Sequence, residues 1–308
     1  MGAAAGAGGD KMGNKAKRGR GQQKGRGKKK TGGRPVTQVA TAPLVKRVVE
    51  KGLVGRRSGR KHAAAIAYMH QLNKDLAHAQ ANQETHRAAA IEQELTELGG
   101  IEAYQQFSLK SESRGVTNSS RWVVSMLREA QLHSPAGRQE AFGAPLPQLA
   151  LLDVGALDDN YRRERAWIAT RAIDLNSQHP FVEKCDFFTV PDEPRYHVIS
   201  LCLVINFVPS PAQRGAMLRR CHELLHPDGW LALMLPLACV NNSRYTTEDR
   251  LLQILGAVGF AVRQRKHTKR LACYWCQRVE PQTPVARELQ TKAVLVEGGG
   301  RNNFAITL

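Results

Sequence analysis

This sequence of 308 residues lacks a long apolar run. No stretch reaches the roughly 18 consecutive apolar residues that a membrane-spanning helix requires. The amino-terminal segment also lacks the apolar centre of a secretory signal peptide. Aromatic residues make up only 6% of the chain, but the apolar content of 42% is enough to build a buried core. We therefore expect an intracellular protein with a substantial folded domain.

Cysteine is scarce as well. Six cysteines are present, mostly within apolar runs, which is typical of buried, reduced thiols. Cys273 and Cys276 have the spacing of a zinc knuckle, but no second Cys or His pair accompanies them at a suitable distance. We expect no metal site. No Ser/His/Asp or Cys/His arrangement indicates a covalent nucleophile.

Acidic residues are nearly absent from the beginning of the chain. Of the 45 Lys and Arg residues, 18 lie within the first 62 positions, where the only acids are Asp10 and Glu50. We predict a disordered basic tail over residues 1–61, since few large apolar side chains are available to offset the entropy of ordering. Repeated cations bind phosphates without regard to sequence, and KGRGKKK resembles a nuclear or nucleolar address. A solubilising tail without a partner is the alternative.

Proline and glycine are absent from residues 62–98, which are rich in Ala, Leu, Glu and Gln. This composition predicts a long helix or a helical pair that ends at the following glycines. The run SSRWVVSMLREAQL predicts another helix. We assign residues 62–133 to a helical module and the Pro- and Gly-rich residues 134–148 to a linker.

The remaining residues, 149–308, change to short apolar runs bounded by turns. QLALLDVG, WIATRAID, KCDFFTV, YHVISLCLVINFV and GWLALMLPL are typical of strands buried on both faces, and helical patterns over 211–225 and 246–259 alternate with them. This alternation predicts a doubly wound, Rossmann-like α/β sheet. We expect AVRQRK, RLACYWCQRV and the terminal NNFAITL to be edge strands, the last of them inserting into the sheet, with a polar insertion at about residues 280–300.

Ligands of such sheets bind at the carboxyl ends of the strands. Gly155 follows the first strand, where the missing Cβ allows a ligand to approach the backbone, and Asp153 beside it can face a cationic group. Asp174 ends the second strand and can accept two hydrogen bonds from a ribose diol. Asp186 and Phe187 follow the third strand and suit the amino edge and the face of an adenine ring.

The glycines that are missing near Gly155 favour one class of cofactor. A dinucleotide needs a glycine-rich turn for its pyrophosphate, but residues 156–159 read ALDD, with bulk and two negative charges. This loop would repel a phosphate and favour the cationic S-adenosylmethionine. The alternative is that Gly155 is an ordinary turn residue and Asp174 a solvated strand end.

Several stretches together resemble a known family. They are LGGIEAYQQFSL, LLDVGALDD, AIDLN, CDFF, SLCLVINFVPSPAQRGAML, LHPDGWLALMLPL, NNSRY and RNNFAITL. From about residue 90 onward the chain is similar to the fungal 25S ribosomal RNA adenine-N1 methyltransferases, a class I group whose animal relatives are adenosylmethionine sensors. The resemblance implies cofactor contacts at Gly155 and Asp174, with further contacts at Asp186, Phe187 and Ser200. It also implies that Arg114 closes over the methionine end.

The reaction implied by this resemblance places demands on the segment after the fourth strand. N1 of neutral adenine carries a lone pair and no proton, so no general base is required, and the base must be unpaired or flipped out. We predict that Asn206 bonds to the adenine edge, that Phe207 stacks on its face and that Pro209 fixes the turn. The alternative is a structural turn. Residues 241–245 either line the same pocket or form an N-cap and loop.

Three functions remain open at this point. The first is methylation of N1 of an adenine in large-subunit ribosomal RNA, with RNA or a pre-ribosome as partner and with nuclear and nucleolar localisation. The second is a non-catalytic adenosylmethionine sensor that acts through a protein partner, and the third is methylation of an adenine amino group. The basic tail favours an RNA enzyme, because a sensor has no need of it. We expect a monomer that binds neither membrane nor metal.

Overall fold

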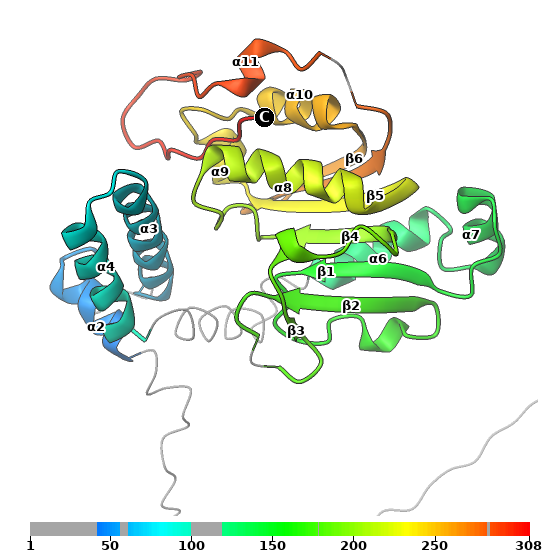
Figure 1. Cartoon of the computed structure of the whole chain (residues 1–308), viewed down its shortest axis with the longest axis horizontal. Helices are drawn as coiled ribbons and strands as arrows, with labels where there is room; N and C mark the ends of the chain where they lie inside the picture. Colours follow the sequence, from blue (N-terminus) through cyan, green and yellow to red (C-terminus); the bar gives the residue numbers. More distant parts are fainter. Residues whose placement is uncertain (1–41, 56–60, 100–118, 178, 282–283) are drawn as a thin grey trace, which may run out of the picture. The chain divides into compact units, whose positions relative to one another are not determined.

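The computed structural model describes residues 42–55, 61–99, 119–177, 179–281 and 284–308 (Figure 1). Arg114 and the basic residues 1–41 lie outside the described residues. None of the helices in the described ranges is both long and apolar enough to cross a membrane.

Three helices form a unit ahead of the sheet: α2 (Ala42–Glu50), α3 (Lys61–Ala81) and α4 (Thr85–Glu97). The predicted helical pair corresponds to α3 and α4. The α2 helix, however, lies inside the predicted tail of residues 1–61, so that prediction is wrong for residues 42–50. Leu44 and Val48, one helical turn apart, are fully buried in the core of this unit. The many Lys and Arg residues around them led to the prediction of a tail, so the apolar stripe of α2 was not recognised in the sequence.

One carboxylate joins the helices of this unit. Glu94 accepts hydrogen bonds from Arg47 Nε at 3.0 Å and from the Tyr68 hydroxyl at 2.7 Å. Lys51 Nζ lies 3.3 Å from the same Glu94 oxygen. Burial raises the pKa of Glu94, but these contacts outweigh it and lower the pKa. The Glu94 side chain on α4 therefore links α4 to α2 and α3.

Seven strands form one sheet in the order β3-β2-β1-β4-β5-β7-β6. The strands are β1 (Leu149–Val154), β2 (Ile168–Asp174), β3 (Glu183–Lys184), β4 (Tyr196–Cys202), β5 (Leu225–Pro236), β6 (Phe260–His267) and β7 (Leu271–Arg278). All neighbouring pairs are parallel except those of β7, which runs antiparallel to β5 and to β6. This arrangement confirms the predicted Rossmann-like α/β fold.

The remaining helices cover the sheet or connect its strands. They are α6 (Ser119–Glu129), α7 (Pro135–Phe142), α8 (Pro211–Leu224), α9 (Ala238–Asn241), α10 (Glu248–Val258) and α11 (Arg287–Gln290), with the 3₁₀ turns η1 (Arg162–Glu164) and η2 (Phe187–Thr189). Side chains of α6 share one core cluster with Leu151 and Val198. Side chains of α8 and α10 share the other with Leu152 and Ile199. Figure 1 accordingly draws α8 in front of the strands and α6 behind them.

The helical module and the linker do not have the predicted boundaries. The α6 helix, assigned to the module, buries Val123 and Leu127 against the sheet and belongs to its core. The predicted linker contains α7, where the buried Arg138 donates hydrogen bonds to four backbone carbonyls, those of Leu132, His133, Leu146 and Pro147. An arginine that satisfies so many carbonyls makes a fixed corner out of a sequence whose prolines and glycines suggested a linker.

Two predicted strands are also wrong. The run KCDFFTV forms the two-residue β3 followed by η2, because the Asp186 side chain accepts a hydrogen bond from Phe188 N and turns the chain. The terminal residues insert into the core without joining the sheet. Phe304 and Ile306 are buried, and a single bridge pairs Asn302 with Ser243.

The CYWC run lies on β7, which is an interior strand of the sheet. Residues three apart on a strand point to opposite faces, so Cys273 and Cys276 cannot bind one metal ion together. Within the described residues no group of His, Cys, Asp and Glu side chains has the geometry of a metal site, and all six cysteines are free thiols.

Candidate active site

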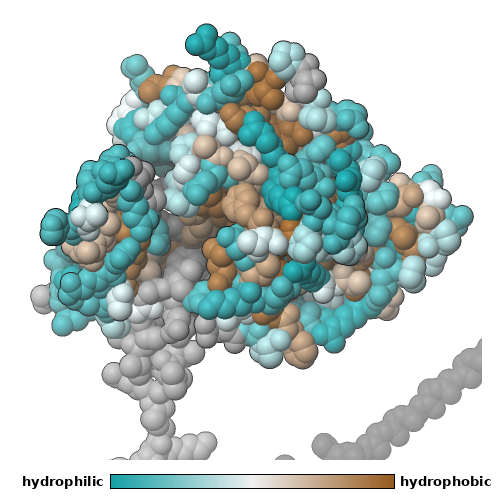
Figure 2. All heavy atoms as spheres, in the orientation of Figure 1, coloured by the Kyte–Doolittle hydropathy of each residue, from teal (hydrophilic) through white to brown (hydrophobic). Residues whose placement is uncertain are grey.

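A hollow of about 290 Å³ opens at the carboxyl edge of the sheet, between the ends of β1 and β2, the segment after β3, the turn after β4 and α8. We call it the edge hollow. Its lining is Val154, Gly155, Ile173, Asp174, Leu175, Cys185, Asp186, Phe187, Phe188, Val204, Phe207, Val208, Pro209, Gln213 and Met217. Most of these side chains are apolar, and two are carboxylates. In Figure 2, tan and brown side chains gather near the end of β4 and the beginning of α8.

Gly155 lines this hollow at the end of β1. Its φ of +70° is strained for any residue with a side chain, and its N–H donates to the carbonyl of Ile173 at 2.8 Å. A Cβ added there would lie 2.6 Å from Cγ2 of Val204 on the opposite wall. The glycine therefore keeps open a space that any other residue would close.

The two carboxylates of the edge hollow are held in place by backbone donors. Asp174 Oδ1 accepts from Asn176 N at 2.8 Å, and Asp186 Oδ1 accepts from Phe188 N at 3.0 Å. Phe187 is only 4% exposed and also lines the edge hollow. Flat apolar walls with fixed carboxylates suit a nucleoside whose ribose and amino group donate hydrogen bonds, and they disfavour phosphate.

Asp153 and Ser200 do not line the edge hollow. They are register partners on β1 and β4 and are almost fully buried, on the α6 side of the sheet. Ser200 has no exposed surface, so its predicted contact with a ligand is wrong. Burial raises the pKa of Asp153 to about 6, although hydrogen bonds from Asn160 and Ser200 act in the opposite direction. Successive residues of a strand face opposite sides of the sheet. Val154 faces the side of α8 and the edge hollow, so Asp153 next to it faces α6.

The turn after β4 brings Phe207 and Pro209 into the wall of the edge hollow. It begins at Leu203, whose φ of +61° is rare for a residue with a side chain. Phe207 N then donates to Val204 O at 2.9 Å. Asn206 lies outside the lining, and its buried Oδ1 has no hydrogen-bond partner among the described residues. Strained backbone conformations and unpaired buried polar atoms occur often at functional sites, and this turn has one of each.

Arg214 on α8 holds this turn from behind. It is 2% exposed, and its guanidinium donates to Val208 O at 2.8 Å, to Pro209 O at 3.1 Å and to Ala305 O at 2.6 Å. It also lies over the Phe304 ring at 4.8 Å. Burial lowers the pKa of Arg214 to about 10. This side chain joins the turn after β4 to the end of the chain.

Residues 241–245 do not line the edge hollow, and the N-cap of α10 is Thr247, so these residues end α9 and form a loop that contacts the end of the chain. Ser243 Oγ donates to Phe304 O at 2.5 Å, and Arg244 Nη1 donates to Asn303 Oδ1 at 2.8 Å. Asn242 Nδ2 donates to Gly300 O at 3.3 Å. The NNSRY and RNNFAITL stretches thus bind each other.

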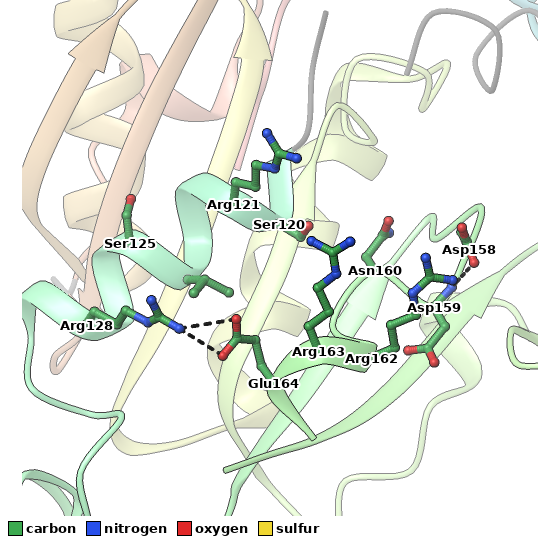
Figure 3. Close-up of a pocket in the computed structure, with 11 residues that line it drawn as sticks. Ser120, Arg121, Ser125, Arg128, Asp158, Asp159, Asn160, Arg162, Arg163 and Glu164 are labelled. Atoms are coloured by element: carbon green, nitrogen blue, oxygen red, sulfur yellow. Dashed lines mark hydrogen bonds and ion pairs between the residues drawn. The ribbon is translucent and has the colours of Figure 1, made fainter. Parts of the chain in front are cut away.

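A second hollow, of about 420 Å³, lies between α6 and the segment after β1 (Figure 3). Asp158 and Asp159 line it and do not line the edge hollow, so they cannot select a ligand there as the sequence suggested. Each is already paired, Asp158 with His179 at 3.2 Å and Asp159 with Arg165 at 2.5 Å. The carboxylates that line the edge hollow are therefore Asp174 and Asp186.

Sequence reasoning missed the apolar walls and Arg214. Val204, Val208 and Met217 carried no chemical signal, because an apolar side chain beside a strand end looks like core. Arg214 did carry one: it is a lone charge in the middle of the run SPAQRGAML, where its helix buries Met217 and Leu218. Only a partner such as a carbonyl-rich turn explains a buried arginine.

The comparisons with known proteins agree with one another. A family model described as "25S rRNA (adenine(2142)-N(1))-methyltransferase, Bmt2" matches residues 89–306. A 25S rRNA adenine-N(1) methyltransferase of Schizosaccharomyces pombe is 32% identical over 273 residues, which cover 85% of this chain and 97% of that relative. A 25S rRNA (adenine(2142)-N(1))-methyltransferase of Saccharomyces cerevisiae is 29% identical over 71% of this chain and 63% of its own length.

Among solved structures, the chain is similar to the 1,6-didemethyltoxoflavin-N1-methyltransferase of Burkholderia thailandensis. The identity is 16%, the match covers 53% of this chain and 88% of that one, and the TM-score is 0.39. A similarity with so low an identity and TM-score adds no information to the strand order described above.

Proposed function

This chain belongs to the Bmt2 family of 25S rRNA (adenine(2142)-N(1))-methyltransferases, and on that premise we propose that it methylates N1 of an adenine in large-subunit ribosomal RNA with S-adenosylmethionine as methyl donor. The observation that carries the proposal is the edge hollow, within the matched residues, where Gly155 makes room and Asp174 and Asp186 supply negative charge. Nuclear and nucleolar localisation and a monomeric state remain predictions from the sequence.

The residues of the edge hollow fit this donor. Gly155 leaves the space that a nucleoside needs, and Asp174 would accept hydrogen bonds from the ribose hydroxyls. Asp186 and Phe187 would take the amino edge and the face of its adenine. S-adenosylmethionine, when bound, supplies a methyl group on a cationic sulfur. The chain's own task is therefore to bind a cation, to exclude water and to position the acceptor.

The acceptor side of the site is the turn after β4. N1 of adenine has no proton to lose, so the turn needs an aligned hydrogen-bonding group and a stacking surface rather than a base. Asn206 Oδ1, which has no partner among the described residues, would supply the first from the same turn whose Phe207 and Pro209 form the wall. Arg214 keeps that turn in one conformation, which limits the entropy lost when the base is positioned.

The experiment is a map of N1-methyladenosine in ribosomal RNA from cells with and without the protein, repeated with Asp174→Ala. Asp192→Ala serves as the matched control, since Asp192 is an exposed carboxylate paired with Arg220 outside the edge hollow. We expect one modified adenine to disappear without the protein and with Asp174→Ala, and to remain with Asp192→Ala. An unchanged map together with measurable donor binding would overturn methylation and leave the sensor.

A further inference from the structure

The hairpin of β6 and β7 carries a cationic surface that the proposed reaction does not use. Residues 263–270, RQRKHTKR, are eight consecutive exposed residues, and five of them are Lys or Arg. No acidic and no large apolar residue interrupts the run. Such a surface suits an anionic partner and offers nothing to an apolar one.

The tip of this hairpin lies at the same edge of the sheet as the edge hollow. Leu271, the first residue of β7, pairs with Pro236, the last residue of β5. Arg270 O accepts a hydrogen bond from Leu237 N at 2.7 Å. Cys202, at the end of β4, pairs with Met234 of β5. Since neighbouring strands are about 4.8 Å apart, β7 lies about 10 Å from β4 across the sheet, and the tip extends beyond the last paired residues of β5.

Only part of the positive charge on the hairpin is neutralised. Glu248 lies 3.7 Å from Arg265 Nη1 and 2.9 Å from His267 Nε2. No ion pair within the described residues involves Lys266, Lys269 or Arg270. These three cations are therefore available to an anion from outside.

The backbone that carries these cations is fixed. Thr268 Oγ1 accepts from Arg270 N at 3.2 Å and from Leu271 N at 3.0 Å, and Thr268 N donates to Leu271 O at 2.8 Å. Cations on an edge strand can also serve only to prevent pairing with another sheet. Lys269 and Arg270, however, lie in the turn beyond the strands, where there is no strand edge to protect.

We propose that the hairpin tip, Lys266, Lys269 and Arg270, binds phosphates of the RNA strand on the flank of the target adenine. The inference rests on the proposed function, because it requires that an RNA strand cross this edge of the sheet. An RNA strand offers one phosphate per nucleotide, so a base held at the turn after β4 brings neighbouring phosphates toward a tip that lies two strands away at the same edge of the sheet. The tip then sets which way the strand runs through the site.

The test compares two double variants that each remove two cations. Lys269→Ala/Arg270→Ala changes the tip. Arg195→Ala/Arg219→Ala is the matched control: Arg195 directly precedes β4 at the opposite edge, and Arg219 is exposed on the second half of α8. Affinity of the full chain for a fragment of large-subunit ribosomal RNA is measured at several salt concentrations, together with steady-state methylation of the same fragment.

For the tip variant we expect RNA affinity about tenfold weaker at low salt. The slope of log affinity against log salt should be shallower by about 1.4, which is two phosphate contacts at about 0.7 each. KM for RNA should rise while kcat and donor affinity stay the same. The control variant should match the wild type in every measurement. Equal KM and equal salt slopes for the tip variant and the wild type would overturn the proposal.

A second measurement does not depend on substitution. RNA should protect Lys266 and Lys269 from acetylation in the wild-type chain, with exposed Lys46 on α2 as the internal reference. Protection of Lys46 alone would contradict the proposal, and protection of the tip by a protein in place of RNA would assign the surface to a different partner. If the wild type methylates RNA and the tip variant is unaffected, only this inference fails. If the wild type methylates no RNA, the proposed function fails with it.

Discussion

At the scale of the residue, Gly155 is the position where we expect a substitution to weaken binding of S-adenosylmethionine most directly. In Gly155→Ala the new methyl group would meet Cγ2 of Val204 at 2.6 Å, and alanine at a φ of +70° is strained. We expect donor affinity to fall at least about tenfold, which is about 1.4 kcal/mol. We also expect the free energy of unfolding to fall by about 1–2 kcal/mol. Calorimetric titration with S-adenosylmethionine and urea unfolding measure the two effects.

Val204→Ala separates the two effects. The double variant Gly155→Ala/Val204→Ala removes the clash but keeps the strained backbone. Donor affinity should therefore recover most of its loss while the stability stays low. A double variant that binds as weakly as Gly155→Ala alone would show that the clash is not the cause.

The buried carboxyl of Asp153 makes stability depend on pH. Its pKa is about 6 in the folded chain against an ordinary value of 3.8, because burial disfavours the ionised form. A raised pKa means that the folded state holds its proton longer, so the free energy of unfolding falls as the pH rises from about 4 to 6. Asp153→Asn has no such titration and keeps an acceptor for Asn160. Its stability relative to wild type should therefore rise by up to about 3 kcal/mol between pH 4 and pH 7.5.

Urea unfolding at the two pH values tests this. Asp192→Asn, at an exposed carboxylate, is the control and should show no comparable change. A difference between Asp153→Asn and wild type that is the same at both pH values would mean that Asp153 does not titrate in this range.

Residue types at strand ends were predictable, but the direction of each side chain was not. Gly155, Asp174 and Asp186 could be found because the end of each strand is visible in the sequence. Asp153 and Ser200 were placed in the same group although each is one residue out of phase and faces α6. In a strand buried on both faces the apolar pattern does not alternate, so the sequence does not reveal which residues point toward the hollow.

At the scale of the element, Arg214 connects α8, the turn after β4 and the end of the chain. Arg214→Ala would leave the carbonyls of Val208, Pro209 and Ala305 without their donor. An unsatisfied buried polar group costs about 1–3 kcal/mol, so we expect the free energy of unfolding to fall by about 3 kcal/mol or more. Urea unfolding at neutral pH measures this loss.

Two further variants define the role of Arg214. Arg214→Lys keeps a charge but cannot reach three carbonyls at once, so its stability should lie between those of Arg214→Ala and the wild type. Arg219→Ala removes an exposed arginine from the same helix and should change stability by less than about 0.5 kcal/mol. A loss of stability for Arg214→Ala no larger than that for Arg219→Ala would show that the hydrogen bonds of Arg214 to the three carbonyls do not stabilise the fold.

Elements with regular periodicity were predictable, and those fixed by side-chain capping were not. The strands β1, β2, β4 and β5 and the helices α8 and α10 follow the apolar runs. The KCDFFTV run turns because of one hydrogen bond from Phe188 N to Asp186. The terminal NNFAITL has the apolar content of a strand, but its polar partners are Ser243, Arg214 and the start of α8, where Thr307 N donates to Pro211 O. Such partners lie about 60 to 100 residues away in sequence and leave no local signal.

At the scale of the whole molecule, two cationic segments are expected to act on RNA in different ways. Residues 1–41 contain 11 Lys and Arg residues and one acid, Asp10, in a low-complexity sequence. The hairpin tip holds Lys269 and Arg270 on a fixed turn at the carboxyl edge of the sheet, with Lys266 near the end of β6. Cations in a repetitive segment attract any polyanion, whereas cations at a fixed distance from the site can act on one register of a strand.

Replacing those 11 Lys and Arg residues by Gln should therefore affect RNA binding in a different way from the hairpin variant. We expect weaker affinity for every RNA, related or unrelated, by about tenfold or more at 0.15 M salt, with a shallower salt slope and an unchanged preference for the large-subunit fragment. Lys269→Ala/Arg270→Ala should instead reduce that preference, because its contacts require the base to be in the site. Competition binding between the target fragment and an unrelated RNA of equal length measures the preference. If the Gln variant lost preference and the hairpin variant did not, sequence discrimination would belong to residues 1–41 and the hairpin would supply only general affinity.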